Sequence, residues 1–189
     1  MKKALFLTMF LPLILGAEAL DRTGPYLAAG GGYATFKDKG RLEGTLNSTQ
    51  NGFITGGAFI NKYLSVELLV DYFDTVTTQN KENTTNLYFF CIDTKAHYSF
   101  WKDRIDLFGS FGAGGVSWKE TLNGVSQKEK SSALMGEAGV GVRVVEDVTL
   151  NVGYRRYFFT LAQNDLTGHI EKQYEMEMSS LYASVEVQF

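Results

Sequence analysis

The last sixteen residues of the chain, Tyr174 to Phe189, read YEMEMSSLYASVEVQF. In a β-strand successive side chains point to opposite faces, so residues two apart share a face. One face of this stretch is therefore apolar and the other polar: Leu181, Ala183, Val185, Val187 and Phe189 against Ser180, Tyr182, Ser184, Glu186 and Gln188. About ten residues of such alternation suffice for a tilted strand to cross a bilayer with its apolar side against lipid. We therefore predict a strand with one lipid-facing side and one hydrated side.

Similar runs with a two-residue period occur along the rest of the chain. We predict eight strands, near residues 24–37, 51–60, 64–78, 85–100, 104–120, 131–145, 148–162 and 174–189. Short turns at 61–63, 101–103 and 146–147 alternate with longer polar connections at 38–50, 79–84, 123–130 and 163–173. Short periplasmic turns and longer external loops are typical of outer-membrane barrels. The sequence thus predicts an all-β fold, an eight-stranded antiparallel up-and-down transmembrane β-barrel.

Charged side chains within the central spans fall on the polar face, with Arg156 as the exception. A charge on the lipid face near mid-bilayer costs roughly 2 to 4 kcal/mol, so this segregation is expected of a membrane barrel. We predict a polar cluster in the lumen, made of Glu67, Asp71, Asp93, Lys95, Glu137, Arg143 and Arg155. Side chains fill a lumen as narrow as that of eight strands, and buried charges must be paired. We interpret the cluster as a plug, with a gated ion path as the alternative.

Aromatic side chains gather near the ends of the predicted strands. At the turn end we place Phe59, Tyr63, Tyr98, Phe100, Trp101 and Phe189, and toward the loop end Tyr72, Tyr88, Trp118, Phe158 and Tyr174. Two aromatic girdles mark the two interfaces of a membrane. Their presence favours a membrane barrel over a soluble one.

The N-terminal segment has the pattern of a secretory signal peptide. Lys2 and Lys3 precede an apolar run that ends in Ala17-Glu18-Ala19, which has the small-x-small form of a cleavage site. The apolar run is too short for a spanning helix. We predict a signal peptide over residues 1–19, export by the Sec route, and a barrel domain over residues 20–189.

Composition and motifs exclude several function classes. A formal net charge of −3 argues against a nucleic-acid partner. The one cysteine, Cys91, and two distant histidines, His97 and His169, do not make a zinc site, and we predict no metal or cofactor. His97-Tyr98-Ser99 has the His-x-Ser form of outer-membrane lipid A deacylases, but it lies near a periplasmic turn and faces the lumen. A deacylase needs its site at the outer leaflet, so we predict no catalytic residues and no enzymatic activity.

The chain resembles the OmpA-type family of eight-stranded outer-membrane barrels. The passage NKYLSVELLVDY, residues 61–72, is similar to that family's second turn and third strand, and TKAHY, residues 94–98, to its fourth strand. The terminal Phe189 resembles the signal read by the barrel-assembly machinery. The resemblance implies a barrel domain alone, because the peptidoglycan-binding domain of many relatives would follow Phe189.

The resemblance also implies that Glu67 and Lys95 belong to an ion-pair cluster that plugs the lumen. The partners that the family supplies from strands six and seven are replaced here by Gly141 and Asn151. We therefore consider other inward charges as substitutes, namely Glu137, Arg143 and Arg155.

We expect a monomeric outer-membrane protein of a Gram-negative bacterium, with a structural or surface-interaction role. Its partners would be outer-membrane lipid and lipopolysaccharide, the barrel-assembly machinery at the C-terminal strand, and a surface ligand at the external loops. One alternative is a small pore or solute channel. Another is a soluble exported barrel that holds an apolar ligand, which requires apolar residues inside and polar ones outside.

Overall fold

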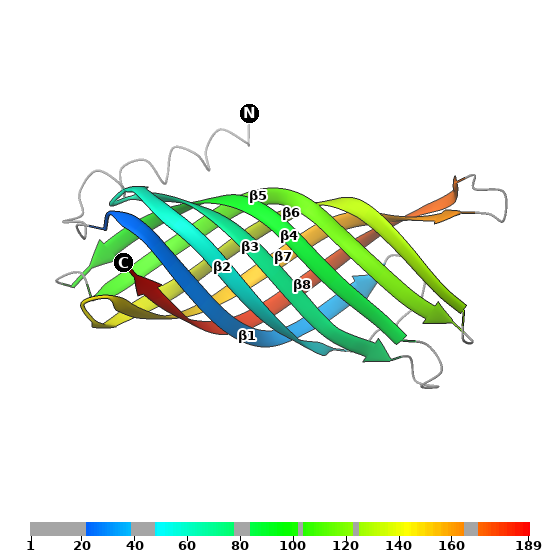
Figure 1. Ribbon diagram of the computed structural model, residues 1–189, viewed down its shortest axis with the longest axis horizontal. Coiled ribbons are helices and arrows are strands. Elements are labelled where there is room, and N and C mark those ends of the chain that lie inside the picture. Colours follow the sequence, from blue (N-terminus) through cyan, green and yellow to red (C-terminus); the bar gives the residue numbers. More distant parts are fainter. Residues whose placement is uncertain (1–21, 39–47, 78–83, 102–103, 123–124, 165–169) are drawn as a thin grey trace, which may run out of the picture.

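The computed structural model describes residues 22–38, 48–77, 84–101, 104–122, 125–164 and 170–189, with side chains for 22–37, 48–73, 86–101, 104–119, 128–160 and 175–189. The strands are β1 (Gly24–Asp38), β2 (Thr49–Asn61), β3 (Leu64–Thr77), β4 (Thr84–Phe100), β5 (Ile105–Leu122), β6 (Val125–Val145), β7 (Val148–Asn164) and β8 (Ile170–Gln188). Each strand pairs antiparallel with the next, and β8 pairs with β1 (Figure 1). The predicted closed eight-stranded barrel is confirmed. No described residue belongs to a helix long and apolar enough to cross a bilayer.

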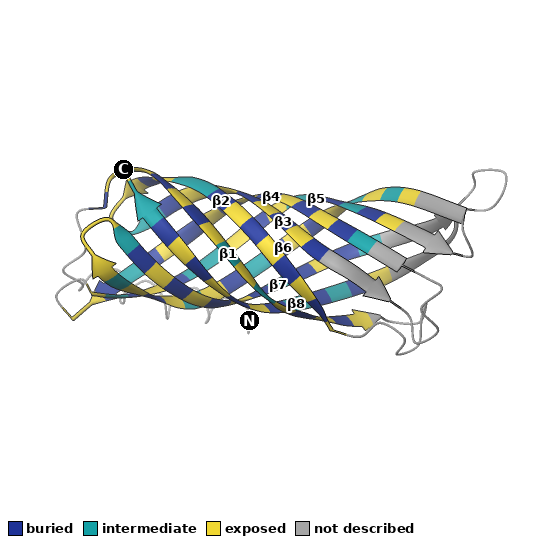
Figure 2. Cartoon of the chain, turned by 60° about the horizontal axis from the view of Figure 1, so that its bottom comes forward, coloured by how far each residue is buried: buried dark blue, intermediate teal, exposed yellow. Residues whose placement is uncertain are grey.

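Buried and exposed side chains alternate along every strand of the barrel (Figure 2). Val140, Val142 and Val185 are 41%, 45% and 46% exposed, whereas Glu186 is 6% exposed and faces the lumen. The outside is therefore apolar and the inside carries charge, as the alternation predicts. The apolar outside is the reverse of the polar outer surface that a soluble ligand-binding barrel requires.

Inward glycines make room for aromatic rings of the neighbouring strand. Gly57 lies directly opposite Tyr26, and Gly153 directly opposite Tyr182. A Cβ atom at either glycine would come within 2.5 Å of the tyrosine hydroxyl oxygen. A ring lying over a cross-strand glycine fills the lumen and protects the exposed backbone, a device that curved sheets use.

The hairpin of β5 and β6 extends further than the sequence predicts. Its pairing continues to Leu122 opposite Val125, so the predicted loop 123–130 is wrong apart from residues 123–124. Lys128, Glu129 and Lys130 lie within β6. About ten residues cross the bilayer, and beyond it the ladder of backbone hydrogen bonds continues without needing an apolar face.

Two predicted girdle residues lie inside the barrel instead. Phe59 and Trp118 are 6% and 1% exposed, because both occupy inward positions of their strands. At the turn end Trp101 is 73% exposed, and at the other end the outward rings of Tyr72 and Tyr88 lie 4.9 Å apart. The side chain of Tyr174 lies outside the described residues. A residue contributes to an aromatic girdle only if it lies near a strand end and its side chain also points outward.

Candidate functional site in the barrel interior

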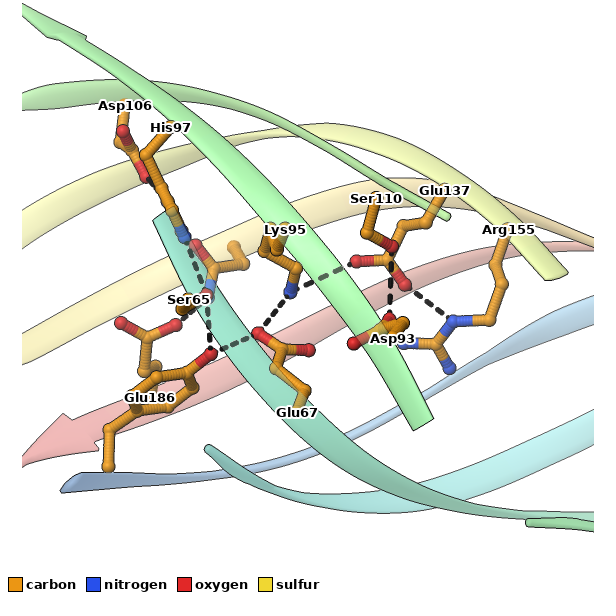
Figure 3. Close-up of polar contacts among 12 residues, drawn as sticks. Ser65, Glu67, Asp93, Lys95, His97, Asp106, Ser110, Glu137, Arg155 and Glu186 are labelled. Carbon is orange, nitrogen blue, oxygen red and sulfur yellow. Dashed lines mark hydrogen bonds and ion pairs between the residues drawn. The ribbon is translucent and has the colours of Figure 1, made fainter. Parts of the chain in front are cut away.

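A continuous chain of ion pairs crosses the middle of the lumen. Figure 3 shows the part that runs from Glu67 through Lys95 and Glu137 to Arg155. Lys95 Nζ on β4 lies 2.7 Å from Glu67 Oε1 on β3 and 3.2 Å from Glu137 Oε1 on β6. Arg155 on β7 places Nε 2.5 Å from Glu137 Oε2 and Nη1 3.0 Å from Asp71 Oδ2 on β3. Negative and positive charges alternate along these five residues, which we call the ion-pair chain. Each charge therefore has an opposite charge as its neighbour.

Uncharged polar groups complete the hydrogen bonding around Asp71 at one end of the chain. The Tyr157 hydroxyl donates to Asp71 Oδ2 at 2.7 Å, and Asn51 Nδ2 donates to Asp71 Oδ1 at 2.9 Å. Ser180 Oγ donates in turn to Asn51 Oδ1 at 2.8 Å. At the other end the Tyr26 hydroxyl donates to Glu67. Removing charges from water is costly unless such partners are present, so the arrangement makes a rigid polar layer.

The Arg155 guanidinium is also enclosed by aromatic rings. Its Cζ atom lies 4.4 Å from the ring centroid of Phe53 and 4.6 Å from that of Tyr182. Lys95 Nζ similarly lies 4.8 Å from the centroid of the Phe108 ring. A cation close to a ring face is stabilised by the ring quadrupole, more so when desolvated. The two cations are therefore held by rings as well as by carboxylates.

The other two predicted cluster residues, Asp93 and Arg143, lie outside the ion-pair chain. Asp93 is 2% exposed and accepts a hydrogen bond from Ser110 Oγ at 3.0 Å. Arg143 is half-buried at the turn end of β6, opposite Thr149. It lies six residues from Glu137 along the strand, which is about 20 Å at the rise of a β-strand. That separation keeps Arg143 out of the central layer.

Glu137 and Arg155 are two of the residues that we considered as substitutes for the charged partners that Gly141 and Asn151 replace. The two residues lie directly opposite each other in the ladder of β6 and β7, as do Gly141 and Asn151. Both members of the pair are displaced by four residues, from 141 to 137 and from 151 to 155. Because four is an even number, the displaced charges still face the lumen.

A second polar cluster, at the turn end of the lumen, is absent from the sequence prediction. Arg22 Nη1 and His97 Nδ1 each lie 2.8 Å from Asp106 Oδ2, and Ser99 Oγ donates to Asp106 Oδ1 at 2.9 Å. Ser65 Oγ lies 3.0 Å from His97 Nε2. Asp106 could have been predicted to face the lumen from its position in the strand predicted at residues 104–120. Arg22 precedes the first predicted strand, so nothing in the sequence pattern indicated that it joins the cluster.

Ser65, His97 and Asp106 have the contacts of a Ser-His-Asp triad but not its setting. Ser65 is 0% exposed, and its Oγ accepts a hydrogen bond from the Tyr26 hydroxyl at 3.0 Å. A catalytic serine needs access for substrate and free N–H donors for the oxyanion, whereas the backbone here is engaged in strand pairing. Ser99, the serine of the His-x-Ser pattern, donates to Asp106 and not to His97. The cluster therefore lacks the substrate access and the oxyanion donors of a serine hydrolase site.

A group of buried apolar side chains lies in the lumen on the loop side of the ion-pair chain, and the sequence did not predict it. We call this group the apolar cluster; its members include Phe36, Leu69, Phe73, Leu87, Phe89, Trp118, Met135, Phe159, Met176 and Met178. The Phe89 ring lies 4.1 Å from that of Tyr157 and 5.3 Å from that of Phe159, centroid to centroid. Part of the signal was present in the sequence, since the inward positions toward the loop end of β4 and β8 are apolar, whereas Thr49 and Asn51 occupy those of β2.

The chain terminus lies at the turn end of the barrel. Phe189 is 71% exposed, and its backbone N–H donates to the Pro25 carbonyl oxygen at 3.0 Å. The predicted signal peptide, residues 1–19, lies outside the described residues. Among the residues that are described, no group of three or more His, Cys, Asp or Glu side chains could hold a metal ion.

Comparison with solved structures identifies barrels of the same fold. Neisserial surface protein A is 22% identical, with a TM-score of 0.62 over 88% of this chain and 98% of that one. OprG of Pseudomonas aeruginosa is 13% identical, with a TM-score of 0.58 over 89% and 98%. The N-terminal barrel of OprF from Pseudomonas aeruginosa is 11% identical, with a TM-score of 0.57 over 89% and 99%. At these identities the likeness concerns the fold.

The family model described as "Outer membrane protein beta-barrel domain" matches residues 5–189. A search of curated proteins finds no significant match. The family match spans the strands, the lumen and the turn-end terminus described above. The chain therefore belongs to the outer membrane protein β-barrel domain family.

Proposed function

We propose that this protein is an integral outer-membrane barrel whose lumen is closed and whose role is structural or one of surface interaction. The observation that carries the proposal is that two groups of buried side chains lie one above the other in the lumen. The ion-pair chain occupies the middle, and the apolar cluster lies on its loop side. An aqueous channel needs a polar, water-filled interior, whereas a group of buried apolar side chains adjoins the ion-pair chain on its loop side.

The experiment is conductance measurement in planar bilayers. Protein that shows a different gel mobility before and after boiling is folded, and this material is reconstituted at increasing amounts. We expect no discrete conductance steps from the native chain. As a matched control, the double substitution Phe89→Ala and Trp118→Ala removes two buried rings from the apolar cluster and should admit ions. Discrete steps from the native protein that change on Glu67→Gln would overturn the proposal in favour of a small pore.

Other parts of the proposal concern export and partners. We propose that residues 1–19 direct export by the Sec route and are removed, with Ala17-Glu18-Ala19 as the supporting motif. N-terminal sequencing of the protein from outer membranes should then begin at Leu20. We also propose a monomer without cofactor or enzymatic activity, with outer-membrane lipid and lipopolysaccharide around the apolar wall and a surface ligand at the external loops.

A further inference from the structure

Three lysines stand together on the outer face of the β5–β6 hairpin, near its loop end. Lys119 on β5 lies directly opposite Lys128 on β6, and Lys130 lies opposite Ser117. All three lysines are exposed. Like charges directly opposite each other in adjacent strands destabilise the pairing. This positive surface, which we call the lysine face, therefore destabilises the pairing of β5 with β6 unless a bound anion neutralises it.

Carboxylates do not share the lysine face among the side chains that the structure describes. Glu129 lies between two of the lysines along β6 but points inward, opposite Trp118. The described outward neighbours of the lysines carry no charge: Gly115, Ser117 and Ser132 on the hairpin, and Asn86 and Tyr88 on β4. On strands β8 and β1 the same loop-end region is matched in charge, since Glu177 lies opposite Lys37 and pairs with Arg156. The lysine face is thus a local excess of positive charge.

The height of the lysine face is set by an interfacial tyrosine. Tyr88 on β4 points outward, lies opposite Ser117, and stacks against Tyr72. Tyrosines on the outside of a membrane barrel mark the headgroup level. Lys130 and Tyr88 both lie opposite Ser117, on either side of β5, and Lys119 and Lys128 lie one step further toward the loops. The lysine face is therefore close to an interfacial tyrosine, where a lipid headgroup would lie.

A groove opens in the barrel wall beside the lysine face. The pairing of β6 with β7 ends at Ala133 opposite Phe159, and beyond it the β5–β6 and β7–β8 hairpins diverge, as Figure 1 shows at its right-hand end. The cavity at this fork has a volume of about 580 Å³. Its lining includes Ser132, Leu134, Phe158 and Met176, together with two carboxylate residues, Glu175 and Glu177, of which Glu177 pairs with Arg156. Ser132 follows Lys130 on the same face of β6, so the groove adjoins the lysine face.

We propose that the lysine face and this groove bind one phosphorylated glycolipid of the outer leaflet, with its phosphates on Lys119, Lys128 and Lys130 and an acyl chain in the groove. The occupant is a lipid A headgroup with two phosphates, because such a lipid combines clustered negative charge with chains at the right depth. The inference deepens the proposed contact with lipopolysaccharide and rests on the outer-membrane location. It does not depend on whether the lumen conducts.

The test is a titration of detergent-solubilised, folded protein with bisphosphorylated lipid A, read by native mass spectrometry and by the shift in Tm. The triple substitution Lys119→Ser, Lys128→Ser and Lys130→Ser should weaken binding at least about tenfold, since one lysine near an anionic surface contributes roughly fivefold. The triple Lys→Arg variant at the same positions should retain binding. Lys62→Ser, which removes an exposed lysine in the turn between β2 and β3 at the opposite end of the barrel, should change nothing.

Further measurements test the role of the groove and distinguish a phosphorylated lipid from free phosphate as the ligand. Ser132→Trp fills the groove without changing charge and should also weaken lipid A binding. Phosphatidylcholine should not bind, and pyrophosphate should compete only weakly because it has no chain. Equal affinity of the native and triple-serine proteins, an equal loss with Lys62→Ser, or full competition by pyrophosphate would overturn the proposal. If the triple-serine variant does not fold, Lys128→Ser alone is titrated, and an unchanged affinity of that variant overturns the proposal in the same way.

Discussion

Among single residues, those of the ion-pair chain show how this barrel keeps charges inside a membrane. Glu137 lies between two cations, and Arg155 lies between two carboxylates. A buried ion pair is not a strong source of net stability, because desolvation offsets the attraction. Removing one member, however, takes a counter-charge from each buried neighbour; without Arg155, Asp71 has no cation left in the chain. The chain therefore acts as a unit.

We predict that Arg155→Met destabilises the folded barrel by about 3 to 5 kcal/mol, the usual cost of breaking a buried pair. Urea unfolding in phospholipid vesicles measures this. Arg156→Met is the matched control, because the neighbouring side chain points outward, is 41% exposed, and pairs with Glu177 at the surface. Its effect should stay within about 1 kcal/mol. Equal effects of the two substitutions would contradict a special role for Arg155.

Among the strands, β8 closes the barrel and leaves Phe189 at its end. The register of β8 against β1 runs from Met176 opposite Asp38 to Gln188 opposite Tyr26. Phe189 follows the last pair and is 71% exposed, so its side chain contributes little to packing. A terminal aromatic residue that the folded barrel scarcely uses fits a role during assembly.

We predict that Phe189→Ser lowers the amount of folded protein in cells, because the barrel-assembly machinery would recognise β8 less well. The measurement is the heat-modifiable band in outer-membrane fractions. Refolding of the same variant into detergent should remain close to that of the native chain. Trp101→Ser is the control, since Trp101 is 73% exposed at the same end of the barrel. If both substitutions lower the folded band alike, the loss reflects the aromatic girdle and not an assembly signal.

The barrel as a whole has two different ends. Lys62 lies in the connection between β2 and β3 at the turn end, and Lys128 lies on β6 near the loop end. Short turns face the periplasm in outer-membrane barrels. The barrel should therefore be inserted with the β5–β6 hairpin pointing outward from the cell.

We predict that a membrane-impermeant maleimide labels Lys128→Cys on intact cells and labels Lys62→Cys only after the outer membrane is permeabilised. The native chain serves as the control, because Cys91 is 0% exposed inside the barrel and should react only on unfolding. Labelling of Lys62→Cys alone on intact cells would show the opposite orientation.

The number of strands, their two faces and the identity of most inward charges follow from the amino-acid sequence alone. Alternation with a period of two assigned Glu67, Lys95, Glu137 and Arg155 to the lumen, because a strand offers a side chain only two directions. The same rule identified the exposed valines of β6 and β8. These are local properties of each strand, so they could be read without knowing its neighbours.

Which inward residues meet one another depends on the folded barrel. Arg143 shares its face with Glu137 but lies too far along the strand, whereas Arg22 reaches Asp106 from outside any predicted strand. The separation of the central ion-pair chain from the apolar cluster also depends on the folded barrel. The physical reason is that the height of a residue in the lumen depends on how the strands are staggered. That stagger is a property of the closed barrel as a whole.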